Sequence, residues 1–176
     1  MSVMTEIVLD TEKEYEIVNG LPEEKEMAGA RHGGVGACLL IELGIYLKTN
    51  HLGGLYGADT TFKIGLNSRI PDIAFVATER IPVTGEPEGG WAFAPDLAVE
   101  IVSPTDLYEK VNAKVREYFV GGVRQVWIVS PEEKTVTVYR GQYDAIIYPA
   151  EAELVSEDLF PGFRCKLNEL FKSPRG

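Results

Sequence analysis

The sequence predicts a mixed α/β domain, and the segment from residue 96 to residue 129 carries most of this prediction. Apolar runs at 96–102 and 125–129 have the length and content of buried strands. Between them, 106–120 has the spacing of a helix, and Asp106 followed by Glu109 is typical of a capping box at its start. A strand, a crossover helix and a second strand place the two strands parallel and the helix across the sheet.

A second helix is predicted over residues 32–50. Its apolar residues recur at every fourth position, as in a helix packed on a core: Val35, Leu39, Leu43 and Leu47. Gly53 and Gly54 are expected to end it. Upstream, 15–20 is predicted as a short strand that runs into a turn, and 21–30 is charged and small, which indicates a loop.

Further strands complete the predicted sheet. Residues 55–64 and 70–78 are read as strands between the two helices, and the Thr, Val and Tyr content of 135–140 suits a strand at a sheet edge. The segments 159–163 and 167–171 are expected to dock back onto the core as a cap. The order is therefore helix, three strands, helix and two strands.

The composition is that of one globular domain spanning residues 1–176. Apolar residues make up 45% and charged residues 25%, the ordinary balance. No apolar run is long enough to cross a bilayer, and no secretory signal pattern is visible at the start. Cys38 and Cys165 lie far apart and match no metal spacing. A cytoplasmic protein without a membrane partner is expected.

The net charge of −10 argues mildly against a nucleic-acid-binding protein. Non-specific binding of DNA comes mainly from Lys and Arg side chains that neutralise phosphates. A catalytic metal ion would add positive charge locally. Any function on nucleic acid must therefore be argued from a site.

Two carboxylates occur where apolar residues are expected. Asp72 follows Pro71 at the start of a strand, where Asp also accepts hydrogen bonds in turns. Glu100 lies inside Leu97–Val102 with apolar neighbours on each side. A buried carboxylate must be paired or metal-bound, because burying it alone costs several kcal/mol. Pairing with an arginine is the structural alternative for Glu100, and a functional role is the interpretation we favour.

Lys114 is predicted to lie on the apolar face of the second helix. At about 100° per residue, Lys114 falls within roughly 40° of Tyr118 and of Leu107. Its side chain then turns toward the sheet, whereas Lys110 is better placed to extend along the margin into solvent. Two carboxylates from neighbouring strands can hold a hard divalent cation, and a lysine beside them can orient an attacking water. The trio thus indicates metal-assisted hydrolysis.

Three stretches of the chain carry a family resemblance: Pro71-Asp72, Pro95–Pro104 and Lys114–Val129. With Met27–His32 and Leu159–Phe163, they resemble the Uma-two-like family, over nearly all of the chain. This family is a bacterial branch of restriction-endonuclease-like proteins within the PD-(D/E)xK nuclease superfamily. The resemblance implies an αβββαβ core, a helix-flanked mixed sheet.

The resemblance also implies a set of site residues. Asp72 and Glu100 would bind Mg²⁺, or Mn²⁺ in its place. The lysine that normally follows the Glu by two residues would fall at Val102, so Lys114 would be a migrated lysine that reaches the same space from the helix. Such sites often include a further acid from the N-terminal region or a phosphate contact, and the candidates here are Glu26, Glu42 and His32. A polar residue at a helix start is the alternative reading of His32.

We therefore expect a metal-dependent endonuclease that hydrolyses phosphodiester bonds of nucleic acid, with DNA the favoured substrate. A homodimer is expected, because cutting both strands of a duplex takes two active sites or one that moves, and because the strand at Thr135–Tyr139 is a candidate for an unpaired edge. The alternative is that the segment beyond Gly141 covers this edge within one chain. The main alternative is a non-catalytic nuclease-fold module that acts through a protein partner, which the acidic charge favours. A sugar hydrolase with paired carboxylates ranks far behind, since the sequence lacks the aromatic clustering of a sugar cleft.

Overall fold

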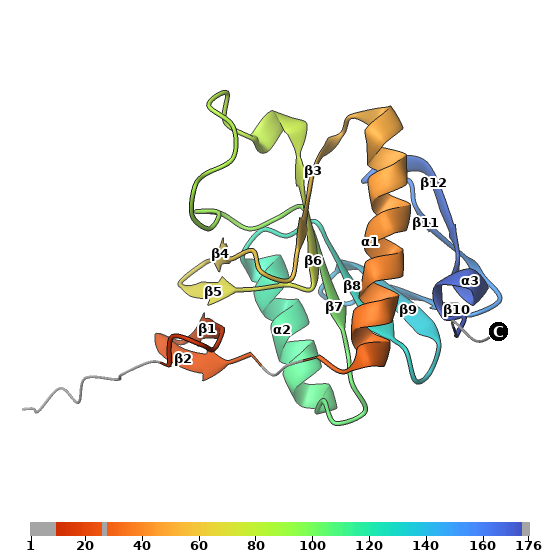
Figure 1. The fold of residues 1–176 in the computed structure, drawn as a ribbon, viewed down its shortest axis with the longest axis horizontal. Coiled ribbons are helices and arrows are strands. Elements are labelled where there is room, and N and C mark those ends of the chain that lie inside the picture. Colours follow the sequence, from red (N-terminus) through yellow and green to blue (C-terminus); the bar gives the residue numbers. More distant parts are fainter. Residues whose placement is uncertain (1–9, 26–27, 174–176) are drawn as a thin grey trace, which may run out of the picture.

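A six-stranded sheet forms the centre of the protein in the computed structural model, which describes residues 10–25 and 28–173 (Figure 1). The strand order is β10-β9-β8-β7-β6-β3. Strands β7 and β8 are parallel, and the other neighbours are antiparallel. The strands are β3 (Gly53–Gly57), β6 (Ile73–Ala77), β7 (Leu97–Ile101), β8 (Gln125–Ser130), β9 (Thr135–Gly141) and β10 (Asp144–Pro149).

Helix α1 (Ala30–Asn50) covers one face of this sheet, and it matches the predicted helix closely. The four apolar residues predicted to face the core are its four buried residues. The helix ends at Asn50, as predicted, but the predicted stop signal was wrong, because the C-cap is His51, which adopts the left-handed conformation with φ of 51°. Gly53 and Gly54 instead begin β3, where they pair with Ala77 and Val76 of β6.

Helix α2 (Tyr108–Val120) covers the opposite face and completes the predicted β7-α2-β8 crossover. The predicted capping box was wrong. Leu107 occupies the N-cap position without a side-chain hydrogen bond, and the Asp106 carboxylate turns back to accept the Ser103 N–H at 2.7 Å. The aspartate therefore closes the preceding turn, and the helix begins two residues after it. Gly121 caps the other end, close to the predicted stop.

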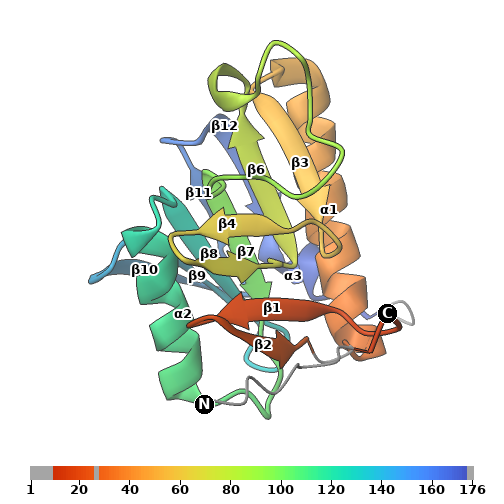
Figure 2. The ribbon, with the colours of Figure 1, turned by 90° about the vertical axis from the view of Figure 1, so that its left-hand side faces the viewer.

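A smaller four-stranded sheet lies on the α2 side of the molecule (Figure 2). Two predictions failed here. Residues 21–24 form a strand rather than a loop, because they pair with β1 in a hairpin. The single strand predicted at 55–64 is two strands in different sheets, β3 and β4, separated by a turn. The order is β2-β1-β5-β4, with β1 (Tyr15–Val18), β2 (Leu21–Glu24), β4 (Phe62–Ile64) and β5 (Asn67–Arg69).

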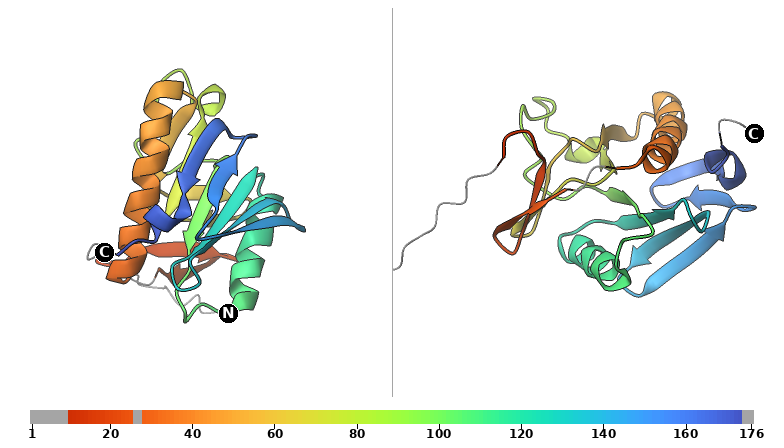
Figure 3. Two further views of the ribbon diagram at one scale, coloured as in Figure 1. Left: turned by 90° about the vertical axis from the view of Figure 1, so that its right-hand side faces the viewer. Right: turned by 60° about the horizontal axis from the view of Figure 1, so that its bottom comes forward.

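The C-terminal part packs on the α1 side, as the cap prediction required (Figure 3). It comprises β11 (Glu153–Ser156), β12 (Phe160–Lys166) and the short α3 (Leu167–Leu170). Phe160 and Phe163 join the same core cluster as the buried residues of α1. The prediction of a sheet edge at 135–140 was wrong, because β10 pairs along the outer side of β9.

The order α1-β3-β6-β7-α2-β8 gives the expected αβββαβ core. A 3-10 turn at Thr78–Arg80 and the predicted loop at 82–90 connect β6 to β7. The described residues contain no helix with the length and apolar character needed to span a membrane. The strands at the middle of the sheet are covered on both faces. The α1 helix and the C-terminal cap cover one face, and α2 and the small sheet cover the other.

Candidate active site

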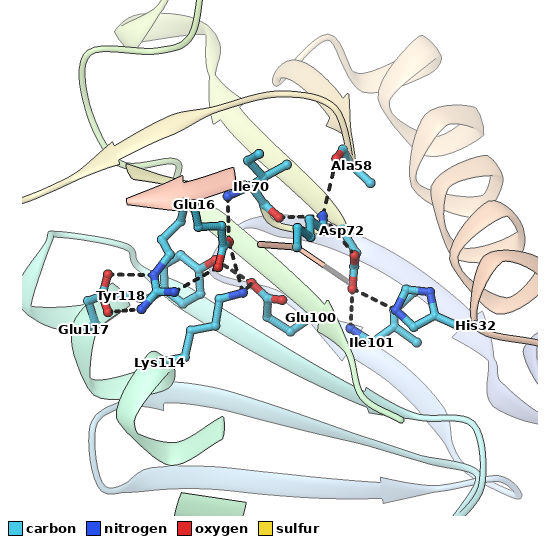
Figure 4. A network of polar contacts seen from close by, with 12 residues as sticks. Glu16, His32, Ala58, Ile70, Asp72, Glu100, Ile101, Lys114, Glu117 and Tyr118 are labelled. Carbon is cyan, nitrogen blue, oxygen red and sulfur yellow. Dashed lines mark hydrogen bonds and ion pairs between the residues drawn. The ribbon is translucent and has the colours of Figure 1, made fainter. Parts of the chain in front are cut away.

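Asp72 and Glu100 lie on the same face of the central sheet, where β6 begins and β7 ends. Ile73 of β6 pairs with Val99 of β7 in antiparallel register, so one step further along the pair brings residue 72 opposite residue 100. The Asp72 N–H donates to the Val99 carbonyl at 3.0 Å, which extends the pairing to this position. Because alternate residues share a face, position 100 faces α2 together with position 72, although the Asp72 carboxylate itself contacts the Ile101 N–H and His32 of α1. The sheet register thus brings the two predicted acids together (Figure 4).

The Asp72 carboxylate is held from several sides and only 9% of its side chain is exposed. Oδ2 accepts the Ile101 N–H at 2.8 Å and lies 3.2 Å from His32 Nε2, while Oδ1 lies 3.4 Å from Lys25 Nζ. Burial alone would raise the pKa of Asp72. These hydrogen bonds and the positive charges outweigh burial and hold that pKa below its usual range. Asp72 is therefore kept ionised.

Glu100 has the opposite electrostatic environment, although it is the neighbouring acid. Its Oε1 accepts the Tyr118 hydroxyl at 2.5 Å and lies 2.9 Å from Lys114 Nζ, and 13% of the side chain is exposed. Burial raises the pKa of Glu100 above its usual range; Lys114 opposes this rise, and the negative charge of Asp72 adds to it. The pair thus combines one acid that loses its proton readily with one that holds it more tightly.

Lys114 reaches Glu100 from the predicted face of α2, which also carries the buried residues Val115 and Tyr118. Its side chain is 22% exposed, whereas Lys110 is exposed at the surface. Burial would lower the pKa of Lys114, but its carboxylate neighbours raise that pKa above its usual range. The ammonium is therefore charged and aimed at the acids.

Glu16 of β1 is a third carboxylate of the cluster that the sequence reading missed. Its Oε1 lies 3.2 Å from Lys114 Nζ and accepts the Ile70 N–H at 2.9 Å, and its Oε2 lies 2.8 Å from Arg69. Burial would raise the pKa of Glu16, but Lys114, the Ile70 N–H and Arg69 outweigh it and lower that pKa. The signal was present in Tyr15–Val18, a strand in which one charged residue lies between apolar ones.

Arg69 ties this acid to α2. Its guanidinium donates to both carboxylate oxygens of Glu117, at 2.9 and 2.5 Å, while also contacting Glu16. Only 9% of the Arg69 side chain is exposed, and a planar guanidinium suits such paired carboxylates. The small sheet is thereby fixed to α2 on the side of the site where Lys114 lies.

A cavity of about 340 Å³ opens beside these residues. Its walls include Glu16, Glu100, Lys114 and Tyr118, and Lys110 also contributes to its lining. Asp72 does not line this cavity, although it is adjacent to Glu100 across the sheet. A substrate group in the cavity would therefore meet Glu100 and Lys114 directly.

The remaining predicted site residues differ in their placement. His32 lies in the first turn of α1 and contacts Asp72, which raises the pKa of the imidazole through their hydrogen bond. Glu42 is exposed on α1 and lies near Cys165, whose pKa burial and Glu42 together raise to about 11. The structure therefore does not bring Glu42 to the cluster, because it faces away from the α2 side of the sheet. Glu26 lies outside the described residues.

Two carboxylates, Asp72 and Glu100, could bind a magnesium or manganese ion, because carboxylate oxygens are hard donors. Mg²⁺ is commonly bound through one or two carboxylates, with water and substrate phosphate as the other ligands. Among the described residues no group of three or more Asp, Glu, His or Cys side chains is arranged to hold a metal ion. Asp72 and Glu100 would therefore supply the protein ligands, and the remaining positions would be filled from solvent or substrate.

The αβββαβ core with an aspartate and a glutamate on adjacent strands defines a protein of the nuclease fold. A solved structure of a "putative nuclease belonging to DUF820" from Anabaena variabilis has the same fold, with a TM-score of 0.82. It is 24% identical to this chain, and the match covers 93% of each. The family model Uma2, described as "Putative restriction endonuclease", matches residues 4–168, and the chain belongs to this family. A comparison with curated proteins gave no match.

Proposed function

We propose that this protein is a metal-dependent endonuclease that hydrolyses phosphodiester bonds of nucleic acid, with DNA as the favoured substrate. The observation that carries the proposal is the ion pair between Lys114 and Glu100, at 2.9 Å, next to the position where the β6–β7 register sets residue 72 opposite residue 100. Membership of the Uma2 family supports it. Mg²⁺ or Mn²⁺ bound there would lower the pKa of a water molecule and offset charge on the phosphate.

The residues of the chain divide the remaining tasks. Asp72 stays ionised, because its pKa is lowered, and so provides a permanent anionic ligand. Glu100 is fixed in orientation by the Tyr118 hydroxyl. The Lys114 ammonium beside Glu100 would orient the attacking water and donate to the phosphate oxygens as negative charge builds up on them. Glu16 would position Lys114 by contacting it from the other side.

The alternative function is a non-catalytic binding module of the same fold. The net charge of −10 favours it, because few lysines and arginines are available for phosphates. The two functions differ in a single assay, the nicking of plasmid and of single-stranded DNA with Mg²⁺ or Mn²⁺. Metal-dependent nicking that is lost in Asp72→Asn supports the nuclease. Metal binding without cleavage of any nucleic acid supports the binding module.

We also propose a homodimer, and the remaining reason for it is the reaction itself. Cleavage of both strands of a DNA duplex needs two active sites, or one active site that moves from one strand to the other. The edge strand on which the expectation was partly based is paired with β10. Sedimentation at micromolar concentration measures the oligomeric state. A monomer would favour nicking or single-strand cleavage.

A further inference from the structure

Lys25 places a second ammonium group at the candidate site, where it contacts Asp72, whereas Lys114 contacts Glu100. Its Nζ lies 2.8 Å from the Ile70 carbonyl, 3.3 Å from the Ala58 carbonyl and 3.4 Å from Asp72 Oδ1. The side chain is 18% exposed. Three oxygen atoms from two segments, at Ala58 and at Ile70–Asp72, are therefore directed at one cation.

This set of oxygens is also chemically suited to a metal ion. One carboxylate and two backbone carbonyls are hard donors of the kind that bind divalent cations. An ammonium has three hydrogens to donate and no acceptor, so it can use all three oxygens. Lys25 thus provides at Asp72 the positive charge that a metal ion would otherwise provide.

The backbone position of Lys25 allows the side chain to leave without breaking the hairpin. Lys25 follows the last residue of β2, and its N–H donates to the Glu14 carbonyl at 2.9 Å. The four-carbon stem of lysine is flexible. The ammonium can therefore move away from Asp72 while the backbone bond remains.

A metal ion and this ammonium would repel one another. A metal ligated by Asp72 at about 2.1 Å would lie within roughly 6 Å of the ammonium, in a partly buried setting where like charges interact strongly. We propose that Lys25 is a resident cation that a divalent metal ion displaces from Asp72, so that Lys25 lowers the metal affinity of the site. This inference rests on the metal site of the proposed function.

The test is Mn²⁺ binding, measured by the paramagnetic resonance of free Mn²⁺ or by calorimetry, in the wild type and in Lys25→Met. The variant should bind Mn²⁺ about tenfold more tightly. In the wild type the Lys25 ammonium occupies Asp72 in part of the molecules, and only the remaining molecules can bind the metal ion; in the variant all molecules can bind it. Lys13→Met is the matched control. Lys13 belongs to the same N-terminal segment and pairs with Glu24, but its side chain is 44% exposed, so its removal should leave Mn²⁺ affinity unchanged.

A second measurement uses the wild type alone and does not depend on the folding of a variant. Lysine acetylation followed by peptide mass spectrometry should show faster labelling of Lys25 when Mg²⁺ is added, with Lys13 unchanged. Unaltered or weaker Mn²⁺ binding in Lys25→Met, or constant labelling of Lys25 in a wild type that binds metal, overturns the inference and leaves the metal site intact. Absence of metal binding in both proteins overturns the proposed metal site and this inference together.

Discussion

Lys114 Nζ lies between Glu100 Oε1, at 2.9 Å, and Glu16 Oε1, at 3.2 Å. The two acids come from different sheets, so one helical lysine links the central sheet to the N-terminal hairpin. The contact brings the ammonium of a lysine on α2 next to the end of β7, where Glu100 lies. It also means that Lys114 has a structural role in addition to the proposed catalytic one.

Lys114→Met should abolish nicking, with a loss of at least about 100-fold, because a charged donor near the developing phosphate charge is removed. Lys110→Met is the control, since Lys110 is exposed on the same helix and should retain most activity. Plasmid nicking per folded molecule is the measurement. A larger loss in the Lys110 variant than in the Lys114 variant would identify Lys110 as the functional lysine.

Lys114→Met should also destabilise the metal-free protein at neutral pH. The variant leaves Glu100 buried without its cation, and breaking a buried pair in this way costs about 3–5 kcal/mol. Denaturant unfolding with chelator present measures the change. A free energy of unfolding equal to that of the wild type would contradict this prediction, and would show that solvent water screens the Lys114–Glu100 ion pair.

Glu100→Gln should raise the melting temperature of the metal-free protein at neutral pH by roughly 3 °C. The pKa of Glu100 is raised in the fold, so the protonated acid contributes stability that is lost as pH rises through that pKa. Glutamine resembles the protonated acid at every pH. The gain over the wild type should therefore be largest at neutral pH and shrink as pH falls through the raised pKa, in thermal scans over that range. A gain that grows toward acid pH would contradict the direction of the shift.

Arg69→Ala should destabilise the fold by about 3–5 kcal/mol, because Glu16 and Glu117 would both lose their guanidinium partner in a buried setting. Arg69→Lys should recover only part of this loss, since lysine cannot match the bidentate contact to Glu117. The exposed Arg116 on α2 is the control, and Arg116→Ala should change stability by less than about 0.5 kcal/mol. If denaturant unfolding gave the same change in the free energy of unfolding for both alanine variants, Arg69 would have no special structural role.

Cleavage should require a divalent metal and should be lost early as salt rises. Two carboxylates and a lysine cannot lower the pKa of water without a Lewis acid. The chain has 17 Lys and Arg against 27 Asp and Glu, so it can make few contacts with DNA phosphates. Its affinity for DNA is then weak, and salt removes it early because salt reduces the free energy gained from counterion release. Nicking measured against Mg²⁺ concentration, from low to physiological salt, tests both statements. Nicking that persists in excess chelator would exclude this mechanism.

The local pattern of the sequence was sufficient to predict the core elements and to select three residues of the candidate site. Periodicity predicted α1 and its buried face, and the parallel β7-α2-β8 unit followed from element order alone. Asp72, Glu100 and Lys114 could be identified because each is a charged residue within an apolar pattern. Burial of a charge has a large cost wherever it occurs, so such a residue is informative without knowledge of the fold.

Only the tertiary structure decided which distant groups complete the cluster and which edge is free. Glu16 reaches Lys114 from 98 residues away in sequence, and Lys25 reaches Asp72 from 47 residues away. Glu42 was one of the two predicted candidates for the additional acid, but it is exposed on α1 near Cys165, away from the cluster. The pairing of β10 with β9 likewise covers the strand predicted to be free. Side-chain ion pairs and strand pairing depend on distances in space, and local periodicity determines only which face of an element is buried.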